Sequence, residues 1–214
     1  ARALGIPLRP PAAARLLLHP HRTRALDVAV AGGRALVHMG GSGFDALIMR
    51  GAQPSLKRIA RWLAYVPPAL KHLRAPEFHY RVTVDGTTEE TRARMVLVAN
   101  GSFVLDPWFR VGEGIRHDDG VLDVCIFTPP NFWGMITLVL WFLAGRVERS
   151  RHLRHLRGRE IRIDAAPPAP VELDGDYAGT TPIELRVHPA AVQVIVPAEA
   201  GEALRRRNRP VADA

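Results

Sequence analysis

Apolar and polar residues alternate with a period of two along most of this chain, which is the pattern of half-buried β-strands. The stretch LDVAVAGGRALVHM alternates on both sides of Gly32-Gly33, and FHYRVTV and ETRARMVLVAN lie on both sides of Asp85-Gly86. A glycine-containing pair between two alternating runs predicts a β-hairpin at each place. Further alternating runs follow over residues 121–127, 159–165, 171–176, 183–188 and 191–197.

Helical spacing of apolar residues is confined to a few segments. The clearest helix covers residues 132–144 and lies between an N-cap, Asn131, and a closing Gly145. Shorter helices are predicted to start at Pro10-Pro11, at Phe44 and at Ser55. Many short strands with few helices predict a mixed α+β fold that is mainly an antiparallel β-sandwich.

The composition fits a globular domain, and the charge indicates a class of partner. The 214 residues are 47% hydrophobic and 23% charged, which is enough for a buried core. The net charge of +8 favours anionic partners such as phosphates or anionic lipid. No nucleic-acid motif is evident, so nucleic acid is not an expected partner. The single cysteine, Cys125, lies in an apolar run, which predicts a buried thiol in a reducing compartment.

Two motifs that resemble catalytic signatures are better explained as structure. Gly40-Gly41-Ser42-Gly43 lacks the spacing of a dinucleotide site and the Lys-Ser/Thr of a phosphate loop, so a tight turn before a helix is predicted. Ser42 does not match a hydrolase nucleophile, because Phe44 stands where that motif needs glycine. His152 and His155 lack the partners of a zinc site, which favours a solvated helix face.

Two acidic turns carry the most informative candidate chemistry. His117-Asp118-Asp119-Gly120 precedes a buried-looking strand, and Glu172-Leu173-Asp174-Gly175-Asp176 joins two strands. Carboxylate and carbonyl oxygens suit magnesium, but each turn taken alone is more often a hairpin with solvated acids. If the two turns met in space, they could hold a metal ion and deprotonate a hydroxyl, as phosphoryl transfer to an alcohol requires.

The apolar run over residues 132–144 has a second interpretation. It is too short to cross a bilayer as a helix, which takes about 20 residues. It contains Trp133, Trp141 and Phe142 and precedes a run of arginines. Aromatic residues beside a basic cluster suit an anionic membrane surface, where each basic residue contributes about 1 kcal/mol. A core helix that covers a sheet is the equally weighted alternative.

The order of these motifs resembles the diacylglycerol-kinase-like lipid kinases, which include bacterial diacylglycerol kinases and sphingosine kinases. The series is ARALGIPL, RALDVAVAGGRALVHMGGSGFDA, VLVANG, DDGVLDVCIF, VELDGD and VHPAAVQVIVP. It covers residues 1–197 and corresponds to the C-terminal part of the family. The resemblance implies a two-domain kinase that binds ATP through a Gly-Gly-Asp-Gly-Thr loop, and these 214 residues do not contain that loop.

The resemblance also implies roles for individual residues. The family's metal site matches the side chain of Asp119 and the backbone oxygens of Arg116 and Val121, so Mg²⁺ is the implied cofactor and ATP the co-substrate. The acidic turn that supplies the family's general base falls on Asp174 and Asp176. Asp176 replaces a glutamate and is one methylene shorter, so either aspartate could act as the base.

These interpretations predict three parts and a function. Residues 1–24 are expected to be the end of an α/β nucleotide-binding domain, 25–197 the β-rich kinase domain, and 198–214 a basic flexible tail. The expected function is transfer of the γ-phosphoryl group of ATP to a membrane lipid hydroxyl by a cytoplasmic, peripherally membrane-associated protein. This chain, as a fragment without the ATP loop, is expected to be inactive alone. The alternative is a non-catalytic lipid-binding module at anionic membranes, and a homodimer is left open.

Overall fold

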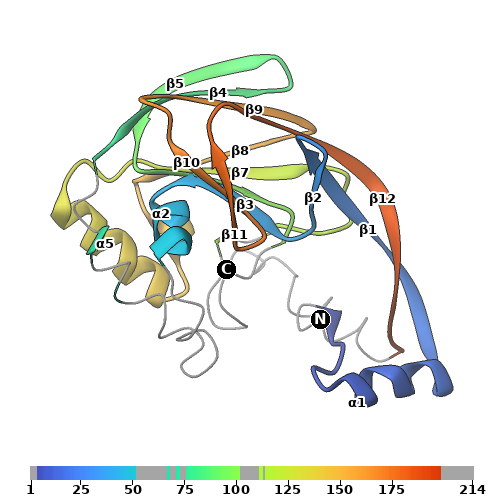
Figure 1. Ribbon diagram of the computed structural model, residues 1–214. Coiled ribbons are helices and arrows are strands. Elements are labelled where there is room, and N and C mark those ends of the chain that lie inside the picture. The colour runs from blue at the N-terminus through green and yellow to red at the C-terminus, as the bar shows by residue number, and fades with distance from the viewer. Residues whose placement is uncertain are drawn as a thin grey trace, which may run out of the picture.

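The computed structural model describes residues 4–51, 67, 71–72, 76–101, 111–112 and 114–198, so the helix predicted from Ser55 and nearly all of the predicted tail lie outside the described residues. Two six-stranded sheets face each other, with the orders β2–β1–β12–β9–β4–β5 and β11–β10–β3–β6–β7–β8 (Figure 1). The first sheet contains β1 (His21–Ala31), β2 (Arg34–Leu36), β4 (Phe78–Val84), β5 (Thr87–Ala93), β9 (Glu160–Ala166) and β12 (Ile183–Pro197). The second contains β3 (Met39–Gly43), β6 (Met95–Ala99), β7 (Leu122–Phe127), β8 (Leu153–Gly158), β10 (Pro170–Leu173) and β11 (Asp176–Thr180).

Alternation along the strands places one face of each sheet in a shared core. Both sheets contribute to it, through Tyr80, Val82, Ile161 and Ile163 from the first and Val96, Val98, Val124 and Ile126 from the second. Burial of one such aliphatic side chain stabilises the fold by about 1.5–3 kcal/mol. The predicted antiparallel β-sandwich is therefore confirmed, together with the hairpins at Gly32-Gly33 and Asp85-Gly86.

The helices lie outside the sandwich. Asn131 caps α5 (Phe132–Leu143) as predicted, because its Oδ1 accepts the N–H of Gly134 at 2.9 Å. α5 packs against the outer face of the second sheet, where Met135, Leu138 and the buried Cys125 belong to a second apolar core. The shorter helices are α1 (Pro10–Ala14), η2 (Arg15–Leu18), α2 (Phe44–Gly51) and η4 (Val147–Arg149). Within the described residues, no helix is long and apolar enough to span a membrane.

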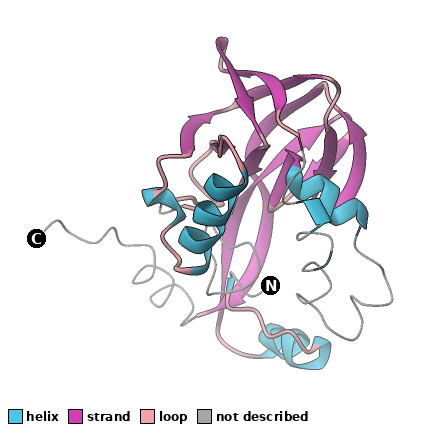
Figure 2. Ribbon diagram, turned by 90° about the vertical axis from the view of Figure 1, so that its left-hand side faces the viewer, coloured by secondary structure: helices cyan, strands magenta, loops and turns pink. Residues whose placement is uncertain are grey.

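Strands β1 and β12 form a ribbon that extends beyond the sandwich and ends beside α1 (Figures 1 and 2). The pairing starts with His21 opposite Pro197. The prediction of two strands over 183–188 and 191–197 is wrong, because β12 is one strand. Residues 189–191 form a bulge opposite Asp27, which interrupts the alternation in the sequence without ending the strand.

Two other local predictions are also wrong. Gly40–Gly43 is not a turn but the inner strand β3, and the glycines are needed because a Cβ at Gly43 would lie 2.4 Å from the Arg94 carbonyl oxygen. His155 lies not on a helix but on β8, and His152 immediately precedes that strand. The polar outer face of an edge strand produced the pattern that was interpreted as a solvated helix.

Asp27 joins the ribbon to the loop before β7. Its two carboxylate oxygens accept the N–H of Gly120 at 2.7 Å and the N–H of Ala190 at 2.8 Å. Its own N–H donates to the carbonyl of His117 at 2.7 Å. Asp27 and Gly120 are both buried, so the N–H of Gly120 would have no solvent to replace the carboxylate. This side chain therefore fixes the acidic loop that contains Asp119 against the first sheet.

Asp27→Ala is expected to lower the free energy of unfolding by about 2–4 kcal/mol, because one buried and one partly buried donor lose a charged acceptor. Urea denaturation of the chain measures this loss. Asp27→Asn should lose less, since its amide oxygen still accepts one N–H. Asp164→Ala is the matched control, because its exposed pair with Arg162 stabilises the fold by less than about 1 kcal/mol. Equal losses in Asp27→Ala and Asp164→Ala would contradict this role of Asp27.

Candidate functional site

The two acidic turns lie at the same end of the second sheet. The N–H of Asp174 donates to the carbonyl of Met39. Across the neighbouring strands, Met39 pairs with Ala99, Ala99 with Asp123, and Asp123 with Arg157, so that these residues form one row. Strands β3 and β6 lie between β10 and β7. Three strand spacings separate Asp174 from Asp123 by about 14 Å. The turns therefore share an edge of the sheet but do not contact each other.

Asp174 is held by the main chain of the link between β2 and β3. Its carboxylate oxygens accept the N–H groups of Val37 at 2.8 Å, His38 at 2.9 Å and Met39 at 3.1 Å. Its φ is +51°, which the short Asp side chain tolerates in a turn. Both oxygens are thus committed to hydrogen bonds, so Asp174 fixes the position of the turn.

Asp176 follows two residues later and starts β11 with its side chain exposed. Within the described part of the chain, no hydrogen bond or ion pair engages its carboxylate. The two aspartates predicted as candidate bases therefore differ in what they can do. Asp174 is saturated by N–H donors, whereas Asp176 is free to accept a proton from a bound molecule.

His117 of the first acidic turn pairs with His38, which lies in the link between β2 and β3. The rings of His38 and His117 stack with centroids 5.7 Å apart and planes 11° apart. Gly101 lies below them, and a Cβ there would lie 2.2 Å from His117 Nε2. Burial, together with the charges of His38 and Arg24, lowers the pKa of His117 to about 4. His38 was missed in the sequence, because only the three-dimensional stacking connects it with His117.

The predicted metal-binding turn is paired with arginines. Asp118 accepts hydrogen bonds from Arg24 at 2.8 Å and Arg116 at 3.0 Å. Burial works to raise the pKa of Asp118, but these hydrogen bonds outweigh it and the pKa is lowered. Asp119 forms an ion pair with Arg157. Burial nevertheless raises the pKa of Asp119, against the opposing effect of Arg157.

Arg157 connects this turn with the buried Asp123. Its Nε lies 3.0 Å from Asp123 Oδ1, which also accepts a hydrogen bond from His155 Nε2 at 2.7 Å. The guanidinium therefore lies between two carboxylates, in the place that a cation at Asp119 would need. No group of three metal-ligating side chains occurs in the described ranges. This arrangement does not fit a resident magnesium ion at Asp119.

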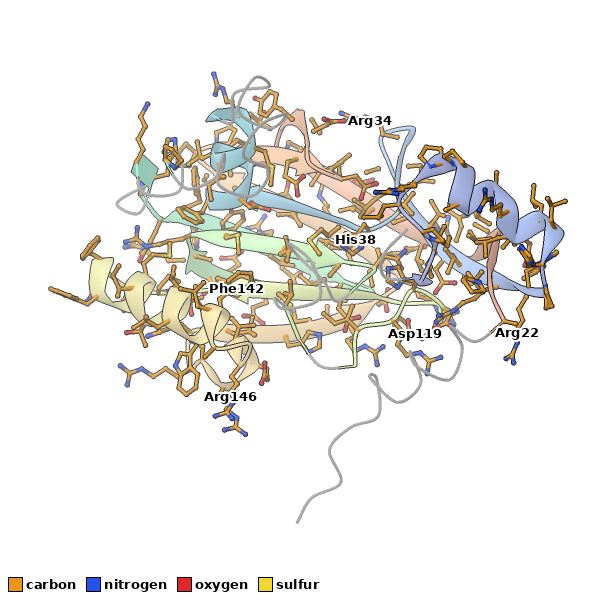
Figure 3. All side chains as sticks on the ribbon, turned by 90° about the horizontal axis from the view of Figure 1, so that it is seen from below. Arg22, Arg34, His38, Asp119, Phe142 and Arg146 are labelled. Atoms are coloured by element: carbon orange, nitrogen blue, oxygen red, sulfur yellow. The ribbon has the colours of Figure 1, made fainter. Side chains whose placement is uncertain are left out.

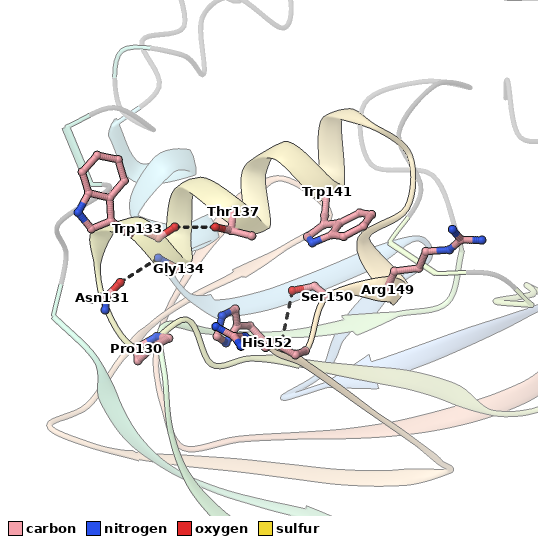
Figure 4. Close-up of a pocket in the computed structure, with 10 residues that line it drawn as sticks. Pro130, Asn131, Trp133, Gly134, Thr137, Trp141, Arg149, Ser150 and His152 are labelled. Carbon is pink, nitrogen blue, oxygen red and sulfur yellow. Dashed lines mark hydrogen bonds between the residues drawn. The ribbon is translucent and has the colours of Figure 1, made fainter.

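A separate pocket of about 420 Å³ lies between α5 and the loop before β8 (Figure 4). Trp133, Trp141, Arg149 and Arg151 line it, and Trp133 is 74% exposed. Phe142 differs from the two tryptophans because it packs against the second apolar core. In Figure 3, Phe142 and Asp119 lie well apart, so the pocket and the acidic turns are different places on the molecule.

Comparison with known proteins connects this geometry to a family. Residues 38–196 match the family described as the YegS C-terminal NAD kinase beta sandwich-like domain. The chain belongs to this family. Its fold is similar to that of a crystal structure titled as a diacylglycerol kinase from Bacillus anthracis str. Sterne, with a TM-score of 0.68 and 21% identity over 92% of this chain and 64% of that one. The resemblance inferred from the motif order is thus confirmed.

Two curated relatives in the comparison are longer proteins. An uncharacterised protein of Synechocystis sp. is 24% identical over 92% of this chain and 46% of its own length. A Staphylococcus aureus (strain Newman) protein named "Putative lipid kinase" is 27% identical over 67% of this chain and 47% of its own length. The chain spans about half the length of these curated relatives.

Metal removal tests whether Asp119 binds a cation. Because Arg157 already balances this carboxylate, neither EDTA nor millimolar Mg²⁺ is expected to change the melting temperature of the chain. Arg157→Gln should lose about 1–2 kcal/mol, as Asp119 and Asp123 then repel each other, and Mg²⁺ should restore part of that loss.

Arg154→Gln on the same strand is the matched control, since Arg154 forms an ion pair with Glu89 and with neither Asp119 nor Asp123. This control should not respond to Mg²⁺. A drop in the melting temperature of the unmodified chain on adding EDTA would indicate a resident metal ion and contradict the role of Arg157.

Proposed function

We propose that this chain forms the C-terminal part of an ATP-dependent lipid kinase, which transfers the γ-phosphoryl group of ATP to the hydroxyl of a membrane lipid such as diacylglycerol. The observation that carries the proposal is the rigid acidic turn. Three N–H donors fix Asp174, and this leaves the carboxylate of Asp176 exposed at a defined place. The names of the relatives support the same reaction class.

Asp176 acts as the general base in this proposal. The lipid oxygen forms a bond to the γ-phosphorus, the bond between that phosphorus and the β,γ-bridging oxygen breaks, and ADP leaves. The hydroxyl proton passes to the Asp176 carboxylate. ATP enters with its own magnesium ion as the substrate complex, so no step depends on a cation at Asp119.

The length of the Asp176 side chain sets how far its carboxylate reaches from the turn toward the lipid hydroxyl. An aspartate places its carboxylate one methylene closer to the backbone than the glutamate that the family resemblance implies. A displacement of about 1 Å can cost about a hundredfold in rate. The turn therefore needs a fixed position, and the three hydrogen bonds to Asp174 supply it.

Asp176→Asn is expected to reduce lipid phosphorylation at least about a hundredfold, because the amide cannot accept the proton. The assay uses the longest natural protein that contains this chain, with radiolabelled ATP and diacylglycerol in mixed micelles. The melting temperature should not change, since no described residue bonds to this side chain. Asp174→Asn should lower both turnover and stability, because the amide presents a poorer acceptor to three N–H groups.

Two controls complete this experiment. The 214-residue chain alone should phosphorylate nothing. Asp164→Asn should keep full activity, because Asp164 lies on β9 in the opposite sheet. Full turnover in a folded Asp176→Asn protein would exclude Asp176 as the base.

The second candidate function is a non-catalytic lipid-binding module at anionic membranes, and it is favoured by the pocket beside α5. Trp133 exposes an aromatic ring beside Arg149 and Arg151. An interfacial element combines apolar and basic groups in this way. The same surface would hold the kinase peripherally at its substrate, with the protein in the cytoplasm.

Trp133→Ser is expected to weaken binding to phosphatidylglycerol vesicles about tenfold, because one buried aromatic side chain contributes about 1.5–3 kcal/mol. Replacing both Arg149 and Arg151 by Gln should weaken it by a similar factor and make binding less sensitive to salt. Vesicle co-sedimentation measures both effects. Val192→Ser on β12 is the control, since it removes an exposed apolar side chain elsewhere. Unchanged binding in both Trp133→Ser and the double arginine variant would exclude this surface.

A further inference from the structure

A buried pair of carboxyl groups lies beneath the acidic turn. Strands β3 and β10 place Gly41 directly opposite Glu172. Gly41 has no side chain, and a Cβ there would lie 1.7 Å from Oδ2 of Asp45 in α2. Directly paired residues have Cβ positions about 5 Å apart on one face of a sheet. The carboxyl group of Asp45 therefore occupies the space over Gly41, next to Glu172.

Within the described ranges, no cation balances either carboxyl group. Glu172 is only 3% exposed, and among the described residues no salt bridge involves Glu172 or Asp45. Oδ2 of Asp45 is buried, and no described N–H or O–H group reaches it. An oxygen that faces a second carboxylate can be satisfied only if one of the two groups carries a proton.

The protonation behaviour of the pair agrees with this geometry. Burial raises the pKa of Asp45 to about 7. Burial, together with the neighbouring charge of Asp45, raises the pKa of Glu172 to about 8. Two like charges in a buried site cannot both form easily, so their protons are lost in coupled steps.

Glu172 also forms a hydrogen bond to the tip of the acidic turn, residues 174–176. Its Oε2 accepts the N–H of Gly175 at 2.7 Å, and Gly175 stands between Asp174 and Asp176. Gly175 has a φ of +89° and no side chain that could anchor it. Asp174 is held from the β2–β3 side, so Glu172 supplies the second attachment of the turn from below.

We propose that Glu172 and Asp45 share one proton and act together as positioning residues for Asp176. The inference rests on the proposed function of Asp176 as the base. With one proton, the pair carries one negative charge and holds Gly175 through Glu172. Without it, two charges lie beneath Asp174 and Asp176, repel them and loosen the turn.

The other described groups around the pair supply neither a hydrogen-bond donor nor a positive charge that could take the place of this proton. Tyr80 of β4 lies near Asp45, but its hydroxyl bonds to Ser42 at 3.2 Å, and burial raises its pKa. Arg50 at the end of α2 lies over the ring of Tyr177, 5.6 Å from its centroid. Strand β3 has no titratable side chain. In the part of the chain that the structure describes, the other charges that act on Glu172 are Asp174 and Asp176, and both are acidic.

The pair predicts how stability depends on pH. The folded chain keeps a proton that the unfolded chain releases near pH 4.5, so the free energy of unfolding falls as pH rises from about 5 to about 8. Glu172→Gln keeps an oxygen for Gly175 and an N–H donor for Asp45, but it does not titrate. This variant should melt about 2–4 °C above the unmodified chain at pH 9, with little difference at pH 5.

Two measurements on the 214-residue chain test the proposal. Melting temperatures between pH 5 and 9 compare the unmodified chain, Glu172→Gln and the exposed control Glu160→Gln. Amide hydrogen exchange at Gly175 should be about tenfold faster in Glu172→Ala and unchanged in Glu172→Gln, because only the alanine variant lacks the acceptor. If Glu172→Ala does not fold, the Glu172→Gln comparison still decides whether a proton is shared.

The outcomes separate this inference from the proposed function. Parallel melting curves for Glu172→Gln and the unmodified chain would overturn the shared proton. Unchanged Gly175 exchange in a folded Glu172→Ala chain would overturn the positioning role. Neither measurement needs catalysis, so an active Asp176→Asn protein would reject the base and leave the carboxyl pair standing. In an active kinase, Glu172→Gln should keep turnover above pH 8, where the unmodified enzyme loses it.

Discussion

The candidate site depends on the antiparallel pairing across the second sheet. Each inter-strand step fixes which residues stand side by side, and one such row runs from the turn at Asp174 to Arg157. A slip of one residue in any pair would move the polar groups of that strand to the opposite face. The sandwich core opposes such a slip, because it would move the valines and isoleucines of β6 and β7 out of the core between the sheets. Packing between the sheets thus sets the positions of groups that do not belong to the core.

Much of this architecture follows from local patterns in the sequence. Alternation identified most of the strands, and glycine-containing pairs located the hairpins, because both signals depend on neighbouring residues. The cap at Asn131 was predictable for the same reason. The errors arose where distant contacts override the local pattern. Gly40–Gly43 forms a strand because Asp45, Leu173 and Arg94 fill the space above its glycines, and nothing in GGSG records those neighbours.

The candidate site was also predictable only in part. Asp174, Asp176 and Asp119 were identified from their turns, yet their environments were not predictable. The partners of Asp174 are backbone groups more than a hundred residues earlier, and the partner of Asp119 is an arginine on another strand. Glu172 belongs to an acidic turn identified in the sequence, but its pairing with Asp45 gave no signal, because the two carboxyl groups meet only when β3 and β10 lie together. Residue types can be read from a sequence, but the balance of charge around them comes from the fold.

The pairing of β1 with β12 also determines when the sandwich can be completed during folding. β1 begins at His21 and needs a partner that ends at Pro197, so the first sheet joins nearly the two extremes of the described chain. Without β12, the β1–β2 hairpin has no strand that connects it to β9, β4 and β5. Pairings between such distant segments carry a high loop-closure cost and fold slowly. On a ribosome, β1 is made before the other strands of the first sheet, so its edge toward β12 stays unpaired until residues 183–197 have been made.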